Sequence, residues 1–470
     1  MKWTVIPETN HVKVTKGFRT LILDLKENIS WDEFEKISGL SKHALQDYTY
    51  GKQRCKPSIK TLKQISQRFS VPAETIQDII VWDKNLENLS RDASNLTDSI
   101  MELNGKKFVD LLKLCRYMKI TGPKQSCFFP LKSRIIERKF VEFHYISING
   151  QFNPKHIIVK RLIPFDKHLF QVFGLIQAEG SKYEKNLAFV FTNSSPNSIK
   201  FILNYFRTVW AIKEGWKCDI TSWNCGSKYD EIRSFWSQEL GISENAVKIR
   251  KGNLYRQSKF AAEFGVCQLK LFNKAFNSII MKLLGEIRAY SENNSDHTGS
   301  YLTGLFSGDG VIVTHNQKFC YTGLAFNQKS QELDHYHKVL SKIGIDFDKN
   351  AIKEKNRRCI IIKNWRAYYK LLRFTDGELF LDESRNNQFI RGILENQYFR
   401  PLLRLGKLKN NEITVKLYSD LFNISRRSSL DCLARLVDLN LLSIKQKNPL
   451  IFEITNSGHE FLKFVEKLKR

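Results

Sequence analysis

Two acidic residues, Glu179 and Asp309, end two copies of one sequence pattern. The copies are LFQVFGLIQAEGS, which ends at Ser181, and SYLTGLFSGDGVI, which ends at Ile312. Each copy is an apolar helical stretch followed by Gly, Leu, an apolar residue, a polar residue, a small residue, the acid and Gly. Carboxylate oxygens suit Mg²⁺, which can polarise a phosphodiester, stabilise its leaving oxygen and activate a water. The repeat therefore predicts a site with one carboxylate from each copy.

Small residues precede both acids and would allow the two helices to touch. Gly174 and Ala178 lie one turn apart on one helix face, and so do Gly304 and Gly308. Without larger side chains, the two helix backbones can approach closely. Close approach puts both acids together at the negative ends of two helix dipoles, which is unfavourable unless a cation lies between them.

The elements expected after each acid also repeat. A strand at 187–192, a helix at 198–209 and extended segments ending in GVCQLKLFN follow the first copy. A strand at 321–327, a helix at 331–343 and strands ending in RRCIIIKN follow the second. Each unit is predicted to run helix, two strands, helix, two strands, helix, which is an α+β half of a pseudo-twofold pair. The segment SKYDEIRSFWSQELGIS predicts an added helix in the first copy.

On these two motifs, roughly residues 165–375 resemble the LAGLIDADG homing endonuclease family. The resemblance implies two αββαββα repeats and hydrolysis of DNA phosphodiester bonds with Mg²⁺ or another divalent cation. It also implies that Glu179 and Asp309 are the metal ligands, each serving one DNA strand, and that a saddle of strands binds the major groove of a long target.

The motifs depart from the family pattern at three positions. Gln177 and Ser307 replace the first acid of the name motif, which is usually not the metal ligand. Glu179 replaces Asp and adds one methylene, so nicking or unequal cutting of the strands stays open. The family resemblance also implies a basic residue near the site, for which Lys270 and Lys363 in the corresponding last strands are the candidates.

Residues 29–82 are predicted to form a helical unit at the N-terminal end. Ser30 and Glu33 have the spacing of a capping box, Gly39 breaks the first helix, and helices at 41–50 and 59–69 follow. The segment GLSKHALQDYTYGKQ resembles the lambda-repressor type of helix-turn-helix. In that motif the second helix enters the major groove, and the candidate DNA-contacting residues here are Lys42, His43, Gln46 and Asp47.

The last 86 residues, 385–470, predict helix, turn, helix, two strands around KQKNPL and a final helix. This order resembles a winged helix, with 425–436 as the recognition helix, carrying Arg426 and Arg427, and 445–449 as the wing. Winged helices also mediate protein contacts, so that alternative stays open. The expected domains are 1–95 (helix-turn-helix), 96–160 (connecting region, no fold assigned), 161–290 and 291–384 (the two repeats), and 385–470.

The charge balance favours a nucleic-acid partner. Lys plus Arg number 75 against 48 Asp plus Glu, a formal net charge of +27, which attracts polyanions. Nine cysteines without a C-x-x-C pair predict neither a zinc site nor a disulfide framework. No signal peptide or membrane span is evident, which predicts an intracellular, cytoplasmic protein without a membrane partner. The cations expected on the saddle are Arg250, Lys251, Arg256, Lys259, Lys353, Lys355, Arg357 and Arg358.

Three functions compete. A homing endonuclease with both half-sites in one chain would be a monomer that cuts double-stranded DNA at a target without a palindrome. A DNA-binding transcription regulator derived from such an enzyme would lose at least one acid, and both are present here. The third function is that of an intron maturase, with the RNA of its own intron as partner. No residue of the sequence favours or excludes it. Splicing as an intein is disfavoured, because the chain starts Met1-Lys2 and ends Lys469-Arg470.

Overall fold

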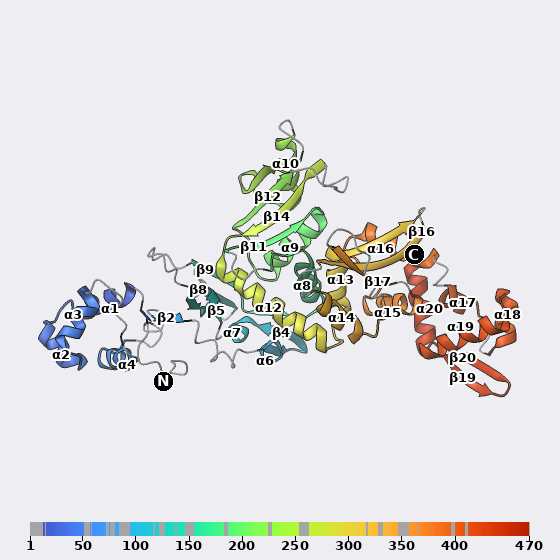
Figure 1. Ribbon diagram of the computed structural model, residues 1–470, viewed down its shortest axis with the longest axis horizontal. Coiled ribbons are helices and arrows are strands. Elements are labelled where there is room, and N and C mark those ends of the chain that lie inside the picture. The colour runs from blue at the N-terminus through green and yellow to red at the C-terminus, as the bar shows by residue number, and fades with distance from the viewer. Residues whose placement is uncertain are drawn as a thin grey trace. The chain divides into compact units, whose positions relative to one another are not determined.

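The structure is a computed structural model. It describes residues 13–14, 16–50, 57, 59–71, 75, 80–83, 95–115, 118–121, 127–136, 139–145, 155–182, 187–223, 228–252, 263–315, 318–327, 332–345, 357–362, 364–395, 400–408 and 412–469. The chain falls into two compact units, which are described separately (Figure 1). Unit 1 holds residues 1–165, 181–194 and 202–286, and unit 2 holds 166–180, 195–201 and 287–470.

Unit 1 begins with four helices around a small apolar core. Ser30 accepts the backbone N–H of Glu33 at 3.2 Å and so caps the second helix. Gly39, with φ of +69°, ends that helix in the left-handed region that glycine tolerates. The sequence predicted three of these helices and missed the first. They are α1 (Lys16–Lys26), α2 (Trp31–Ser38), α3 (Lys42–Tyr50) and α4 (Ile59–Arg68), and their core is Phe18, Ile22, Phe34, Leu45, Leu62, Ile65 and Val71.

Residues 96–160, left without a predicted fold, form short antiparallel strands, which share two of their three sheets with strands from before and after this region. The first sheet has the order β1-β2-β6-β5, from Lys13–Val14, Ile80–Asp83, Cys127–Pro130 and Lys119–Thr121. The second has the order β10-β4-β3, from Leu162–Pro164, Lys106–Asp110 and Ile100–Leu103. The third is β7-β8-β9, from Lys132–Ile136, Phe140–Tyr145 and Lys155–Lys160. Two one-turn helices, α6 (Leu96–Ser99) and α7 (Leu111–Leu114), accompany them.

The main sheet of unit 1 buries one face and exposes the other. Along β12 and β14, buried residues alternate with more exposed ones, as a half-buried sheet requires. On the buried face, the ring of Phe206 lies 5.1 Å from that of Phe276 and 5.3 Å from that of Phe189. The strand order is β11-β14-β12-β13, from Phe189–Asn193, Val266–Leu271, Trp216–Ser222 and Val247–Lys251, with only β12 and β13 parallel in this sheet.

Four helical segments belong to this part of the chain. The predicted helix at 198–209 is α9, and the predicted added helix is α10, which Gly241 ends with φ of +56°. Helices α9 and α12 contribute residues to both units. The bounds are Pro196–Thr208 for α9, Tyr229–Leu240 for α10, Glu244–Ala246 for the 3₁₀ turn η2 and Lys274–Asn293 for α12.

Unit 2 contains both motif helices, α8 (Lys167–Glu179) and α13 (Thr298–Asp309). These helices, one from each predicted repeat, pack against each other. The predicted bounds of the repeats, 161–290 and 291–384, stay a prediction. An antiparallel sheet follows in the order β15-β16-β17, from Gly310–His315, Lys318–Asn327 and Arg357–Ile362. Helix α14 (Glu332–Lys342) lies between β16 and β17 in the chain. The sheet is followed by α15 (Trp365–Phe374), α16 (Glu383–Glu395) and α17 (Arg400–Leu405).

The C-terminal elements of unit 2 follow the predicted order of helix, turn, helix, hairpin and helix. Asn423, with φ of 49°, makes the turn between the first two helices, and Ser425 caps the second by accepting the N–H of Ser428. The elements are β18 (Ile413–Thr414), α18 (Val415–Phe422), α19 (Arg426–Asp438), β19 (Leu442–Lys447), β20 (Leu450–Ile454) and α20 (Asn456–Lys469), with the sheet order β18-β20-β19.

The described residues together form a mixed α+β architecture. None of the described helices combines the length and the apolar composition needed to cross a bilayer. The described cysteines with free thiols are Cys115, Cys218, Cys267, Cys320, Cys359 and Cys432.

Candidate functional site

The two motif helices touch through their backbones. A Cβ atom built on Gly304 would lie 2.1 Å from the carbonyl oxygen of Gln171 and 2.6 Å from the amide nitrogen of Leu175. A Cβ atom on Gly174 would lie 2.2 Å from the carbonyl oxygen of Tyr301. Real Cβ atoms do not come this close to backbone atoms, so only glycine fits at either position. The crossing of α8 and α13 therefore depends on both glycines.

The same contact brings the acid-bearing helix ends together. A Cβ atom on Gly308 would lie 2.4 Å from the Cβ atom of Ala178 and 2.8 Å from Cγ of Glu179. The side chain of Glu179 thus passes directly over Gly308, the residue before Asp309. Both carboxylates lie at the C-terminal ends of their helices, where the helix dipoles are negative.

Asp309 is held by a tyrosine that the sequence did not single out. The hydroxyl of Tyr336, on α14, donates to Oδ2 of Asp309 at 2.7 Å. Burial raises the pKa of Tyr336 well above its ordinary value, and the charge of Asp309 raises it further. Tyr336 is therefore neutral and serves as a hydrogen-bond donor to the carboxylate.

A buried hydrogen-bond chain fixes α14 beside this site. The Tyr301 hydroxyl lies 2.8 Å from Nε2 of His335, and Nδ1 of His335 lies 2.7 Å from Oε1 of Glu292. Burial of Glu292 raises its pKa, but its hydrogen bonds to His335 and Lys338 outweigh this, and the net pKa is lowered. These contacts hold the neighbouring residue, Tyr336, against α13.

A half-buried arginine, Arg385, binds the end of α13 from α16. Nη1 of Arg385 donates to the carbonyl oxygen of Ser307 at 3.1 Å, and Nη2 donates to that of Gly310 at 2.7 Å. Its guanidinium lies 4.6 Å from the centre of the Phe380 ring. Burial lowers the pKa of Arg385, whereas the charges of Asp382 and Glu179 oppose that shift. Arg385 stays charged, because even a lowered arginine pKa lies far above neutral pH.

The residues present can be tested against the predicted Mg²⁺. Glu179 and Asp309 offer the oxygen ligands that Mg²⁺ prefers. However, one oxygen of Asp309 already accepts a hydrogen bond, and the guanidinium of Arg385 supplies positive charge at this helix end. Within the described part of the chain, no three His, Cys, Asp or Glu side chains are grouped as metal ligands. The residues present do not fit the expectation that a metal ion must balance the acids, and Mg²⁺ stays an untested prediction.

The predicted basic candidates of the site have different positions. Lys270 lies in β14, where its ammonium is 2.6 Å from Oδ2 of Asp219. Lys270 thus forms an ion pair within the unit 1 sheet. Lys363 lies outside the described residues. A catalytic role for either lysine stays a prediction.

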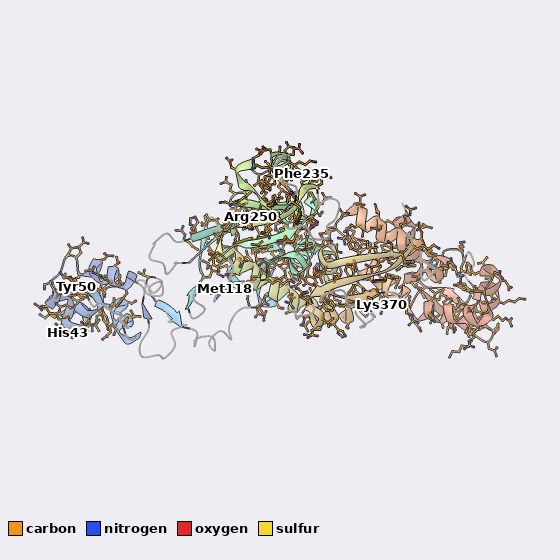
Figure 2. The ribbon with its side chains drawn as sticks, turned by 45° about the horizontal axis from the view of Figure 1, so that its top comes forward. His43, Tyr50, Met118, Phe235, Arg250 and Lys370 are labelled. Carbon is orange, nitrogen blue, oxygen red and sulfur yellow. The ribbon has the colours of Figure 1, made fainter. Side chains whose placement is uncertain are left out.

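One face of the unit 1 sheet carries four cations, Lys217, Lys248, Arg250 and Lys270, which we call the basic sheet face (Arg250 is labelled in Figure 2). Three of them are exposed, whereas only 13% of the Lys270 side chain is exposed. The strand register puts them on one face. Lys270 is paired with Lys217, and Lys248 is paired with Asp219, which lies two residues after Lys217 on the same side of β12. Arg250 lies two residues after Lys248 and so points to the same side of β13. The alternation in WKCDITS and VKIRK is the sequence signal from which Lys217 and Lys248 could have been found.

One acid lies among these cations. Oδ2 of Asp219 accepts from Nη2 of Arg250 at 2.7 Å and from Nζ of Lys270 at 2.6 Å. The aspartate thus holds both side chains in place on the sheet. Lys251, at the end of β13, is exposed on the other side of the strand from Arg250.

The predicted DNA-contacting residues of the N-terminal helices lie on α3. Lys42 is paired with Asp32 at 2.6 Å, and His43, which is labelled in Figure 2, lies 3.2 Å from Asp47. His43 is exposed and Gln46 is half-buried. The surface of α3 is therefore accessible, although the charge of Lys42 is partly satisfied within the protein.

In the C-terminal elements, Arg426 and Arg427 are exposed on the first turn of α19. Arg357 and Arg358 begin β17, and their side chains lie outside what the structure describes. The remaining predicted saddle cations also lie outside the described residues: Arg256, Lys259, Lys353 and Lys355.

Comparisons with known proteins give remote likenesses. No protein-family model matches the chain, and no curated protein matches it. One similar solved structure is the N-terminal LAGLIDADG domain of DUF199/WhiA, at 11% identity and a TM-score of 0.26, over 44% of this chain and 82% of that one. Another is the full-length DUF199/WhiA from Thermatoga maritima, at 15% identity and a TM-score of 0.27, over 58% of this chain and 90% of that one.

Proposed function

We propose that this protein binds double-stranded DNA and acts as a regulator that does not cleave it. The observation that carries the proposal is the basic sheet face, where the exposed cations Lys217, Lys248 and Arg250 lie on one side of two neighbouring strands, beside the less exposed pair of Lys270 and Asp219. The major groove of DNA admits a β-ribbon, and lysine and arginine bind its phosphates and its guanine edges. The net charge of +27 supports a polyanionic partner.

The terminal elements add surfaces of the same kind. Exposed Arg426 and Arg427 begin α19, and exposed His43 lies on α3. Helices that follow a short turn can enter the major groove with their first residues toward the bases. We propose that these helices contribute affinity and target choice.

The tested variant is Lys217→Ala with Lys248→Ala. Each phosphate contact contributes about −0.9 to the slope of log K against log salt, so losing two contacts should flatten the slope by about 1.8. Affinity should fall for all sequences alike, because phosphate contacts position a protein without reading bases. The measurement is a salt titration of binding to one duplex by fluorescence anisotropy.

The matched control is Lys106→Ala with Lys107→Ala, which removes the same charge from two exposed positions of β4. This control should leave the slope close to that of the wild type. Equal slopes for the two double variants would mean that the basic sheet face is not where DNA binds.

Hydrolysis of DNA is the second candidate, and the meeting of Glu179 with the Gly308–Asp309 turn is the observation that favours it. The test incubates the wild type and the variants Asp309→Asn and Glu179→Gln with a randomised DNA library and Mg²⁺, and sequences the cut ends. Under the proposal of binding without cleavage, the wild type should yield no more cut ends than the variants. An excess of ends that Asp309→Asn removes would instead assign hydrolysis to this site.

A further inference from the structure

The acid-bearing ends of α8 and α13 pose an electrostatic problem. Two carboxylates at two negative helix ends repel each other, and α8 and α13 pack backbone to backbone at Gly174 and Gly304, one turn before these ends. A positive charge close to both would remove this cost. The question is whether a group of the protein itself supplies that charge.

Arg385 has the required position. Its two hydrogen bonds bind the carbonyl oxygens of Ser307 and Gly310, which lie on either side of Asp309 in the sequence. Glu179 lies over Gly308, between those two residues. The guanidinium is therefore anchored within one turn of Asp309, and it also feels the charge of Glu179.

Contacts with neighbouring residues of its own segment also hold Arg385 in this position. Its backbone N–H donates to Oδ1 of Asp382 at 2.9 Å, which fixes the first turn of α16. Its guanidinium packs on the ring of Phe380. Two carbonyl bonds and an aromatic contact leave it little freedom, and a planar guanidinium loses less entropy per hydrogen bond than a lysine would.

We propose that Arg385 is a built-in counter-cation for Glu179 and Asp309, a positioning residue that makes the folded acid pair independent of divalent metal. The proposal concerns the charge balance of the protein alone. It is therefore tested without DNA, and its failure is distinguishable from failure of the proposed DNA binding.

The experiment measures the Tm of the full chain in EDTA and in Ca²⁺. The wild type should melt at the same temperature in both. Arg385→Met should melt lower in EDTA and should regain a few degrees in Ca²⁺, because an ion that binds only the folded acid pair stabilises it by mass action. Arg385→Lys keeps the charge, so it should show a smaller loss and no Ca²⁺ response.

A second set of variants separates charge from the lost hydrogen bonds. Adding Glu179→Gln to Arg385→Met should raise the Tm in EDTA and abolish the Ca²⁺ response, since one of the repelling charges is gone. Arg391→Met is the matched control on the same helix, because Arg391 is exposed and pairs only with the exposed Glu395 in the described contacts. It should behave as the wild type.

Two results would overturn the proposal. The first is a wild-type Tm that rises in Ca²⁺ as much as that of Arg385→Met. The second is an Arg385→Met protein, folded or not, that Glu179→Gln fails to improve, which would reduce Arg385 to a hydrogen-bonding cap of α13.

Discussion

Gly304→Ala is expected to destabilise the protein strongly, because the added methyl group has no room between α8 and α13. The new Cβ atom would overlap the carbonyl oxygen of Gln171 and the amide of Leu175, both of them backbone atoms of α8. Backbone atoms cannot rotate away as a side chain can, so the whole helix would have to shift. Overpacking commonly costs about 1–3 kcal/mol, and this position should reach about 3 kcal/mol or more.

Gly285→Ala provides the comparison within the same chain. Gly285 lies exposed in the middle of α12, and a Cβ atom added there would meet no other atom within 4 Å. Alanine there should stabilise the protein by about 0.5–1 kcal/mol, because glycine is a poor helix former. Thermal unfolding followed by circular dichroism measures both variants. Equal melting temperatures would show that α8 and α13 do not touch at Gly304.

The close approach of the motif helices was within reach of the sequence. Small residues at i and i+4 define a helix face on which two backbones can meet, whatever surrounds them. Gly174 with Ala178 and Gly304 with Gly308 have that spacing, and the structure brings these positions together. Such a local pattern needs no knowledge of the rest of the fold.

The sequence could not show which residues would lie beside the two acids. Tyr336 comes from α14 and Arg385 from α16, and each looks in the sequence like one polar residue of an amphipathic helix. Their roles depend on which helix face packs against α13, which is a tertiary property. The sequence favoured lysines in strands, Lys270 and Lys363, and could not show that Tyr336 donates to Asp309 and that Arg385 donates to the carbonyl oxygen of Gly310.

No fold could be predicted for residues 96–160, for a different reason. Its strands span only three to six residues and its helices four each, which is too short for a clear period of 2 or 3.6. One of its sheets also needs a distant partner, since β4 pairs with β10 near residue 163. The end of β4 is also tied to the start of β10 by the ion pair between Asp110 and Arg161, and removing this pair has a large expected effect.

Arg161→Met is expected to lower the free energy of unfolding by about 3–5 kcal/mol, the usual cost of leaving one partner of a buried ion pair unpaired. The Asp110 carboxylate is fully buried and accepts from Nε of Arg161 at 3.0 Å and from Nη2 at 2.7 Å. These bonds raise the pKa of Arg161, so the guanidinium is firmly charged. Without it, the carboxylate keeps only the N–H of Leu112 among the hydrogen bonds of the described residues.

Two further variants decide whether the unpaired charge is the cause. Arg134→Met breaks an exposed pair with Glu142 on β7 and β8 and should cost no more than about 1 kcal/mol. Adding Asp110→Asn to Arg161→Met removes the stranded charge while an amide oxygen can still accept from Leu112, so part of the lost stability should return. Chemical denaturation of the four proteins, wild type included, measures this. If Arg161→Met costs no more than Arg134→Met, the buried pair does not hold β4 to β10, and the apolar contacts of Val109 and Ile163, both fully buried, must hold the strands instead.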